Sequence, residues 1–184
     1  MDEPARPRLP VEVTRSRRRR RTVEASIVDG VIQVRAPAAM SETELAAHVS
    51  ELVTRLERRY RSDGIDLERR ARTLAARFDL PRPDSIVWAD QRSRWGSCTT
   101  TTRAVRISNR LAAYPPWVLD YVIVHELAHL VVPGHDARFH AIVDRYPLAE
   151  RARGFLMAVS YGDAAAPDEL APDDPVDDDP VTLF

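Results

Sequence analysis

The sequence has no lysine, a single cysteine and no long apolar run. Its 184 residues include 27 basic side chains, and all of these are arginine. Because Cys98 is the single cysteine, the sequence excludes an intramolecular disulfide framework and a zinc ribbon built from cysteines. No apolar stretch reaches the roughly 18 residues of a transmembrane helix, and the charged first ten residues lack the apolar core of a secretory signal. We therefore expect a cytoplasmic protein with no membrane association.

Charge is distributed unevenly along the chain. Residues 1–161 hold all 27 arginines and 20 acidic residues, whereas residues 162–184 hold eight acidic residues and no base. This tail is rich in Pro, Asp and Ala and has too little apolar surface to offset the entropy of ordering. We predict a flexible N-terminus over 1–13, one folded domain over 14–161 and an acidic disordered tail over 162–184.

The densest positive charge is the run RSRRRRR at 15–21. One interpretation is an electrostatic contact with nucleic acid through Arg15–Arg21, and the other is a solvated strand with arginines on both faces. Asp29-Gly30 follows this run and separates two alternating apolar segments. An Asp-Gly pair in that position predicts a β-hairpin of about 22–28 and 31–35.

The rest of the chain alternates between helical and extended patterns. Ser41 and Glu44 form a capping box, which predicts a helix that ends near Arg61. Asp136 is an expected N-cap for a later helix. Further helices are expected at 67–78, from Pro116 to Pro133-Gly134, at 137–145 and at 148–160, and strands at 85–90 and 103–109, with the loop SRWGSCTTT between these strands. This order predicts an α+β fold.

The segment His125-Glu126-Leu127-Ala128-His129 matches the pattern HExxH. Histidines at i and i+4 lie on one face of a helix, so both imidazoles can bind one cation, and imidazole nitrogen suits Zn²⁺. Glu126 can reach a metal-bound water as general base without being a ligand. The alternative is a pair of buried histidines satisfied by protein partners, and burying these polar groups without a purpose is costly.

A catalytic zinc needs a third protein ligand and one open position. His135 lies six residues after His129, the same interval as in HExxHxxGxxH sites, and Pro133-Gly134 would let the chain turn back over the metal. It is the preferred candidate on ligand type and reach. The alternatives are Asp136, His140, Asp144 and Glu150.

Two other residues near these motifs have open roles. Asp120 could orient His125 or cap the start of its helix, because a zinc-bound histidine usually donates its second N–H to a carboxylate or carbonyl. Cys98 is either a reactive thiol or a small packed residue, and nothing in the sequence marks an activating partner.

Four segments together resemble a known family: RWGSC at 94–98, ISNRL at 107–111, VLDYVIVHELAHL at 118–130 and GHDARF at 134–139. They are similar to the YgjP-like metallopeptidase family, which is related to the SprT-like and WLM zincins, and the resemblance covers roughly 14–160. It implies a zincin-like α+β fold, with an N-terminal β-hairpin and a small antiparallel or mixed sheet packed on helices. It also implies that His125, His129 and His135 bind zinc, that Glu126 is the catalytic base and that RWGSC lies close to the metal.

The favoured function is a zinc-dependent metallopeptidase with one Zn²⁺ per chain and a peptide or protein substrate. An extended substrate would pair with an edge strand such as 103–109. A second hypothesis is a zinc hydrolase of nucleotide phosphoanhydrides, or a protease associated with nucleic acid, in which arginines hold phosphate. A third is a nucleic-acid-binding module with a structural metal.

Overall fold

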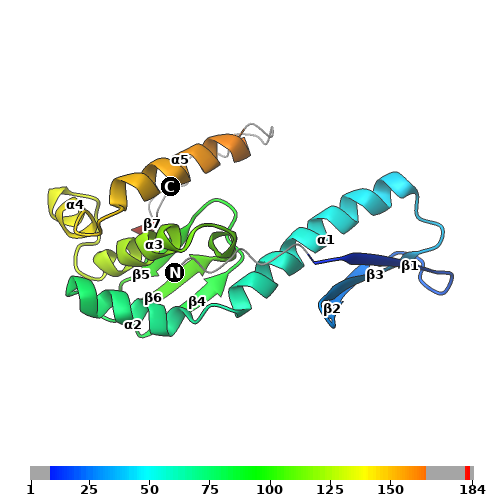
Figure 1. Cartoon of the computed structure of the whole chain (residues 1–184), viewed down its shortest axis with the longest axis horizontal. Helices are drawn as coiled ribbons and strands as arrows, with labels where there is room; N and C mark the ends of the chain where they lie inside the picture. The colour runs from blue at the N-terminus through cyan, green and yellow to red at the C-terminus, as the bar shows by residue number, and fades with distance from the viewer. Residues whose placement is uncertain (1–8, 165–180, 183–184) are drawn as a thin grey trace. The chain divides into compact units, whose positions relative to one another are not determined.

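The computed structural model describes residues 9–164 and 181–182 (Figure 1). The chain forms two compact units: unit 1 comprises Met1–Ile65 and unit 2 comprises Asp66–Phe184. Unit 1 combines a small sheet with one helix and unit 2 combines a small sheet with several, which confirms the α+β class. The extent of a single functional domain over 14–161 stays a prediction. Among the described residues, no helix is both long enough and apolar enough to cross a bilayer.

Unit 1 contains the predicted hairpin. Strands β2 (Glu24–Val28) and β3 (Val31–Pro37) pair antiparallel, with Asp29 and Gly30 at φ values of 50° and 77°. Positive φ at both turn residues matches a type I′ turn, which follows the natural twist of the strands. Strand β1 (Val11–Ser16) lies parallel to β3 on its other side. It begins inside the segment that we expected to be a flexible N-terminus, and its largely exposed side chains leave no burial pattern to predict it.

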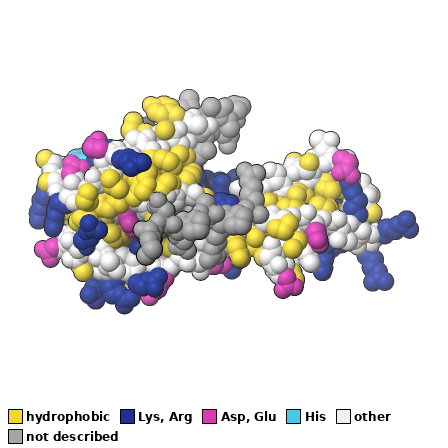
Figure 2. Space-filling model, in the orientation of Figure 1, with side chains coloured by type: hydrophobic (Ala, Val, Ile, Leu, Met, Phe, Trp, Pro, Cys, Tyr) yellow, Lys and Arg dark blue, Asp and Glu magenta, His cyan; other side chains and the backbone are white. Residues whose placement is uncertain are grey.

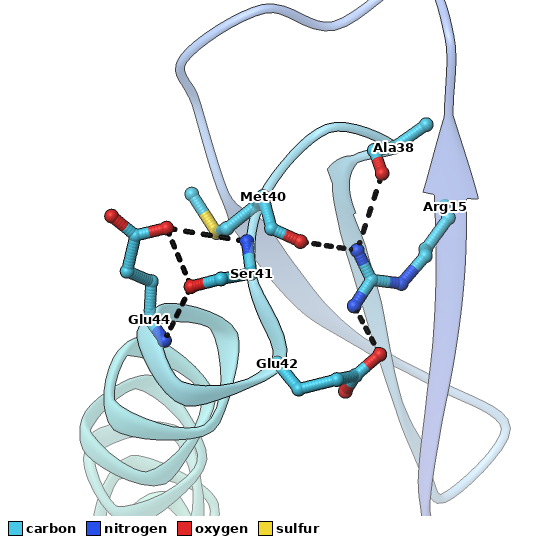
Figure 3. Close-up of polar contacts among 6 residues, drawn as sticks. All are labelled: Arg15, Ala38, Met40, Ser41, Glu42 and Glu44. Carbon is cyan, nitrogen blue, oxygen red and sulfur yellow. Dashed lines mark hydrogen bonds and ion pairs between the residues drawn. The ribbon is translucent and has the colours of Figure 1, made fainter.

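Helix α1 (Glu42–Asp63) covers this sheet through contacts with β2 and β3. The capping box is confirmed: the Ser41 hydroxyl accepts the Glu44 backbone N–H, and the Glu44 carboxylate accepts the Ser41 backbone N–H (Figure 3). Arg15 donates to the Met40 carbonyl at 2.7 Å and to the Glu42 carboxylate at 2.5 Å. The end of β1 is therefore tied to the start of α1.

Unit 2 is organised around a four-stranded sheet in the order β4-β6-β5-β7. Strands β4 (Ser85–Ala89) and β6 (Ala104–Ser108) are parallel, whereas β5 (Gly96–Thr99) runs antiparallel to both β6 and β7 (Val181–Thr182). Two expectations were wrong here. The loop SRWGSCTTT contains β5, and the segment 103–109 is not an edge strand, because β6 has a partner on each side.

The helices of unit 2 are α2 (Leu67–Phe78), α3 (Pro116–His129), α4 (Ala137–Val143) and α5 (Ala149–Ala164), with a short 3₁₀ helix η1 (Asn109–Ala113) before α3. Helix α3 contacts α2, α4, α5, β5 and β6, and from Val118 onward every residue except Asp120 is buried. It is the central element of the unit. Most of the predicted disordered tail lies outside the described residues, apart from the end of α5 and β7.

Candidate metal centre

Three histidines converge at the end of α3. The Nε2 atom of His125 lies 3.1 Å from Nε2 of His129 and 3.1 Å from Nε2 of His135. The spacing of four places the first two on one face of α3, and the chain after the helix returns to bring in the third. His129 is fully buried and His125 is 5% exposed, whereas His135 is exposed. The cluster is thus a buried pair of imidazoles with a third on its solvent side.

The electrostatic surroundings favour neutral imidazoles. Burial, reinforced by the neighbouring histidines, lowers the pKa of His125 to about 2. Burial also lowers the pKa of His129 to about 4 and that of His135 below its ordinary value. His129 Nδ1 lies 3.3 Å from the Val132 carbonyl, so donating its proton there leaves the Nε2 lone pair directed at the cluster. Neutral imidazoles with such lone pairs are what a metal ion requires.

Phe139 holds the three rings in place. Its ring stacks on His129 with a centroid separation of 4.4 Å and contacts the edges or faces of His125 and His135 at 4.7 Å each. The ring is 1% exposed. Asp136 caps α4 by accepting the Phe139 backbone N–H at 2.9 Å, so the confirmed helix cap also fixes Phe139. Sequence reasoning missed this role, since an aromatic residue in a short helix ordinarily indicates core packing alone.

Glu126 lies beside the cluster on the same helix and is fully buried. Neither carboxylate oxygen has a hydrogen-bond partner among the described residues, and burial raises the pKa of Glu126 well above its ordinary value. Its side chain lies against Gly96 of the RWGSC segment. A Cβ placed on Gly96 would be 2.8 Å from Cγ and Cδ of Glu126, and closer still to Oε1. The glycine is therefore required by the close approach of β5 to the carboxylate.

The donor set fits a zinc ion. Two nitrogens bound to one zinc at about 2.0–2.1 Å, at the tetrahedral angle, would lie about 3.3 Å apart. The two separations from His125, 3.1 Å each, come close to this value, and the ligand atoms of all three histidines lie within 4.8 Å of one another. The Nε2 lone pairs of neighbouring imidazoles this close together repel one another unless a proton or a cation lies between them, and the Glu126 carboxylate has no hydrogen-bond partner among the described residues. A cation held by the three imidazoles would satisfy these lone pairs and supply a positive charge beside the carboxylate.

The structure places the other candidate ligands elsewhere. Asp144 and Glu150 both form ion pairs with Arg153, and Asp136 is engaged as the helix cap. His140 is exposed and is not among the three histidines whose ligand atoms converge. Within the described ranges 9–164 and 181–182, no other group of three such residues has this geometry.

Asp120 and Cys98 both have structural roles in unit 2. The Asp120 carboxylate accepts from Arg70 on α2, which ties two helices together, while Nδ1 of His125 has no hydrogen-bond partner among the described residues. Cys98 is fully buried in β5, and its burial, together with the nearby Glu126, raises the pKa of the thiol to about 12. Cys98 is a packed residue of the sheet.

Comparison with known proteins gives one match. The family model described as YgjP-like, metallopeptidase domain, matches residues 50–156, which is more than half of the chain. The matched range includes β5, α3, α4 and all three clustered histidines. Neither the curated proteins nor the solved structures contain a significant match.

Proposed function

Because the chain belongs to the YgjP-like metallopeptidase domain family, we propose that it is a zinc-dependent metallopeptidase with a zincin-like site that hydrolyses peptide bonds. One Zn²⁺ per chain binds His125, His129 and His135. The observation that carries the proposal is the convergence of three imidazole nitrogens beside a buried, unpaired carboxylate on the HExxH helix. A structural site would fill all four zinc positions, whereas three protein ligands leave one open for chemistry.

The chemistry needs both the ion and Glu126. Zinc at these nitrogens supplies a Lewis acid that polarises the substrate carbonyl, lowers the pKa of water and favours the charged form of Glu126. The Glu126 carboxylate takes a proton from the attacking water and returns it to the departing amine. Because no protein group hydrogen-bonds this carboxylate among the described residues, both of its oxygens are available for that transfer.

Access to the site follows from the difference in burial among the ligands. His125 and His129 lie in the interior, and only His135 reaches solvent. We therefore place the entry of substrate on the His135 side. Val132 and Phe139 keep the imidazoles oriented from within, through the carbonyl contact and the ring contacts.

The decisive experiment separates metal binding from turnover. Glu126→Gln keeps the size of the side chain but cannot accept a proton, so it should retain one zinc per chain and lose about 10²–10⁴-fold in peptide hydrolysis. His135→Ala should lose the metal. His140→Ala is the matched control and should keep both metal and activity. Full activity in Glu126→Gln, or retention of zinc in His135→Ala, would contradict the proposal.

The substrate class is a separate part of the proposal. Casein and peptide libraries should be assayed beside nucleoside triphosphates, because hydrolysis of phosphoanhydrides is the alternative that the arginine content raised. If the protein hydrolyses a nucleotide but no peptide, and Glu126→Gln abolishes that activity, the proposed metal site would stand and the proposed substrate would change from a peptide to a nucleotide. The cytoplasmic location stays a prediction from the sequence.

A further inference from the structure

Unit 1 contains a groove lined by arginines. Its cavity of about 290 Å³ lies between one face of α1 and the segment that leads into β2. The residues that line it are Arg21, Val23, His48, Glu51, Leu52 and Arg55. The four from α1 are spaced i, i+3, i+4 and i+7, so they share one side of the helix. This volume is at the lower end of the range for small-molecule pockets and suits a single phosphate-sized group with its attachments.

Several arginines here have no partner within the described part of the protein. Arg15 is bound to the corner between β3 and α1 (Figure 3), and Arg19 pairs with Glu24 at 2.6 Å. In contrast, the described contacts of the chain include no hydrogen bond or ion pair for Arg17, Arg18, Arg20, Arg21 or Arg55. Figure 2 shows basic side chains projecting from the end of unit 1 that carries the connection from β1 to β2. These cations are free to bind an external anion.

The chemistry of the groove matches a phosphodiester. Guanidinium groups bind phosphate oxygens in pairs of parallel hydrogen bonds, and Arg21 and Arg55 offer two of them across one cavity. Val23 and Leu52 add apolar surface to the lining, and an apolar surrounding strengthens these charge interactions. Glu51 also lines the groove, but it has an interaction of its own, and the two arginines outnumber it.

We propose that unit 1 binds the phosphate backbone of a single-stranded nucleic acid, with one phosphate seated between Arg21 and Arg55. Arg17, Arg18 and Arg20, which precede Arg21 in the sequence, then contact neighbouring phosphates. Several arginines without a partner among the described residues, close in sequence to Arg21, favour a chain of phosphates over one small anion. The inference does not rest on the proposed peptidase function, since none of these residues belongs to the three-histidine cluster.

The test is fluorescence anisotropy of the full chain with a labelled single-stranded oligonucleotide of about 20 nucleotides, titrated from low to physiological salt. Arg21→Ala combined with Arg55→Ala should weaken binding roughly 100-fold, because each of the two charge-assisted contacts contributes about a factor of ten. The slope of log K against log salt should become shallower by about 0.7, the value for one lost phosphate contact on a single strand.

The matched control removes the same charge from unit 2. Arg72 and Arg106 are exposed, and replacing both with alanine should change affinity less than twofold. Circular dichroism melting should show that both double variants fold, since all four side chains are on the surface. Equal loss in the two double variants, absence of salt-dependent binding, full displacement by millimolar inorganic phosphate, or binding to anionic lipid vesicles without binding to the oligonucleotide would each overturn the proposal.

Discussion

Replacing Gly96 with alanine should damage both stability and catalysis through one contact. The new methyl carbon would lie 2.8 Å from Cγ and Cδ of Glu126, whereas carbon atoms pack best at about 3.5–4.0 Å. Neither side can easily retreat. Gly96 pairs with Ile107 in the sheet, and Glu126 is held in a helix that is buried on nearly all sides. Relieving the overlap therefore requires a shift of roughly 1 Å in the carboxylate or in β5.

The size of the expected losses in stability and turnover follows from the lack of space between Gly96 and Glu126. Overpacking a rigid interior costs about 1–3 kcal/mol, and the constraint on both partners places Gly96→Ala in the upper half of that range. With a urea m-value of about 1–3 kcal/mol/M, the unfolding midpoint should fall by about 1 M. Displacing the general base by about 1 Å should reduce turnover by about 10²-fold. Urea unfolding followed by tryptophan fluorescence, and peptide hydrolysis on the same samples, measure the two effects.

Two variants separate the clash from other effects of the added methyl. Gly154→Ala changes a glycine in α5 whose Cβ would meet nothing within 4 Å, so it should raise stability by about 0.5–1 kcal/mol. Glu126→Ala removes the atoms that the added methyl group would meet. In a double-mutant cycle, the pair should be coupled by about 1–2 kcal/mol, so that the second substitution recovers stability but not activity. Wild-type stability in Gly96→Ala, or a cycle without coupling, would refute the reasoning.

Two other measurements test the buried groups of the site. In metal-free protein, the free energy of unfolding should be greatest near pH 6.5, about the ordinary pKa of histidine. Above that pH the raised pKa of Glu126 lets the folded protein retain a proton that the unfolded chain has lost, so stability should fall as pH rises. Below it, the unfolded chain protonates His125 and His129 while the folded protein, with pKa values of about 2 and about 4, does not, so stability should fall as pH falls. Urea unfolding between about pH 5 and 8.5 checks both limbs, and Glu126→Gln should lose only the alkaline one. Cys98 should resist a colorimetric thiol reagent at about pH 8 in the folded protein and react fully in urea, because its thiol is buried and its pKa is raised to about 12; rapid reaction of the native protein would contradict this.

Local patterns were sufficient to predict many elements. The helix over 67–78 has the predicted bounds, and the strands at 85–90 and 103–109 are present to within a residue. Asp29-Gly30 and the Ser41–Glu44 capping box act within a few residues of the chain, so their geometry is encoded where it occurs. Strands β1 and β5 were missed because their stability comes from pairing with β3 and β6 rather than from their own residues.

The convergence of His125 and His129 could be read from the sequence alone, because a helical spacing of four decides their shared face. The preference for His135 over the other candidates was based on its position six residues after His129, and it agrees with the place of His135 in the cluster. Its role as a ligand stays a proposal. Tertiary packing decided the rest. Phe139 reaches the imidazoles only because α4 folds back on α3, and Gly96 is needed only because β5 passes against Glu126. Contacts between segments so far apart in the sequence depend on how the whole core packs, so they cannot be predicted from a local pattern of residues.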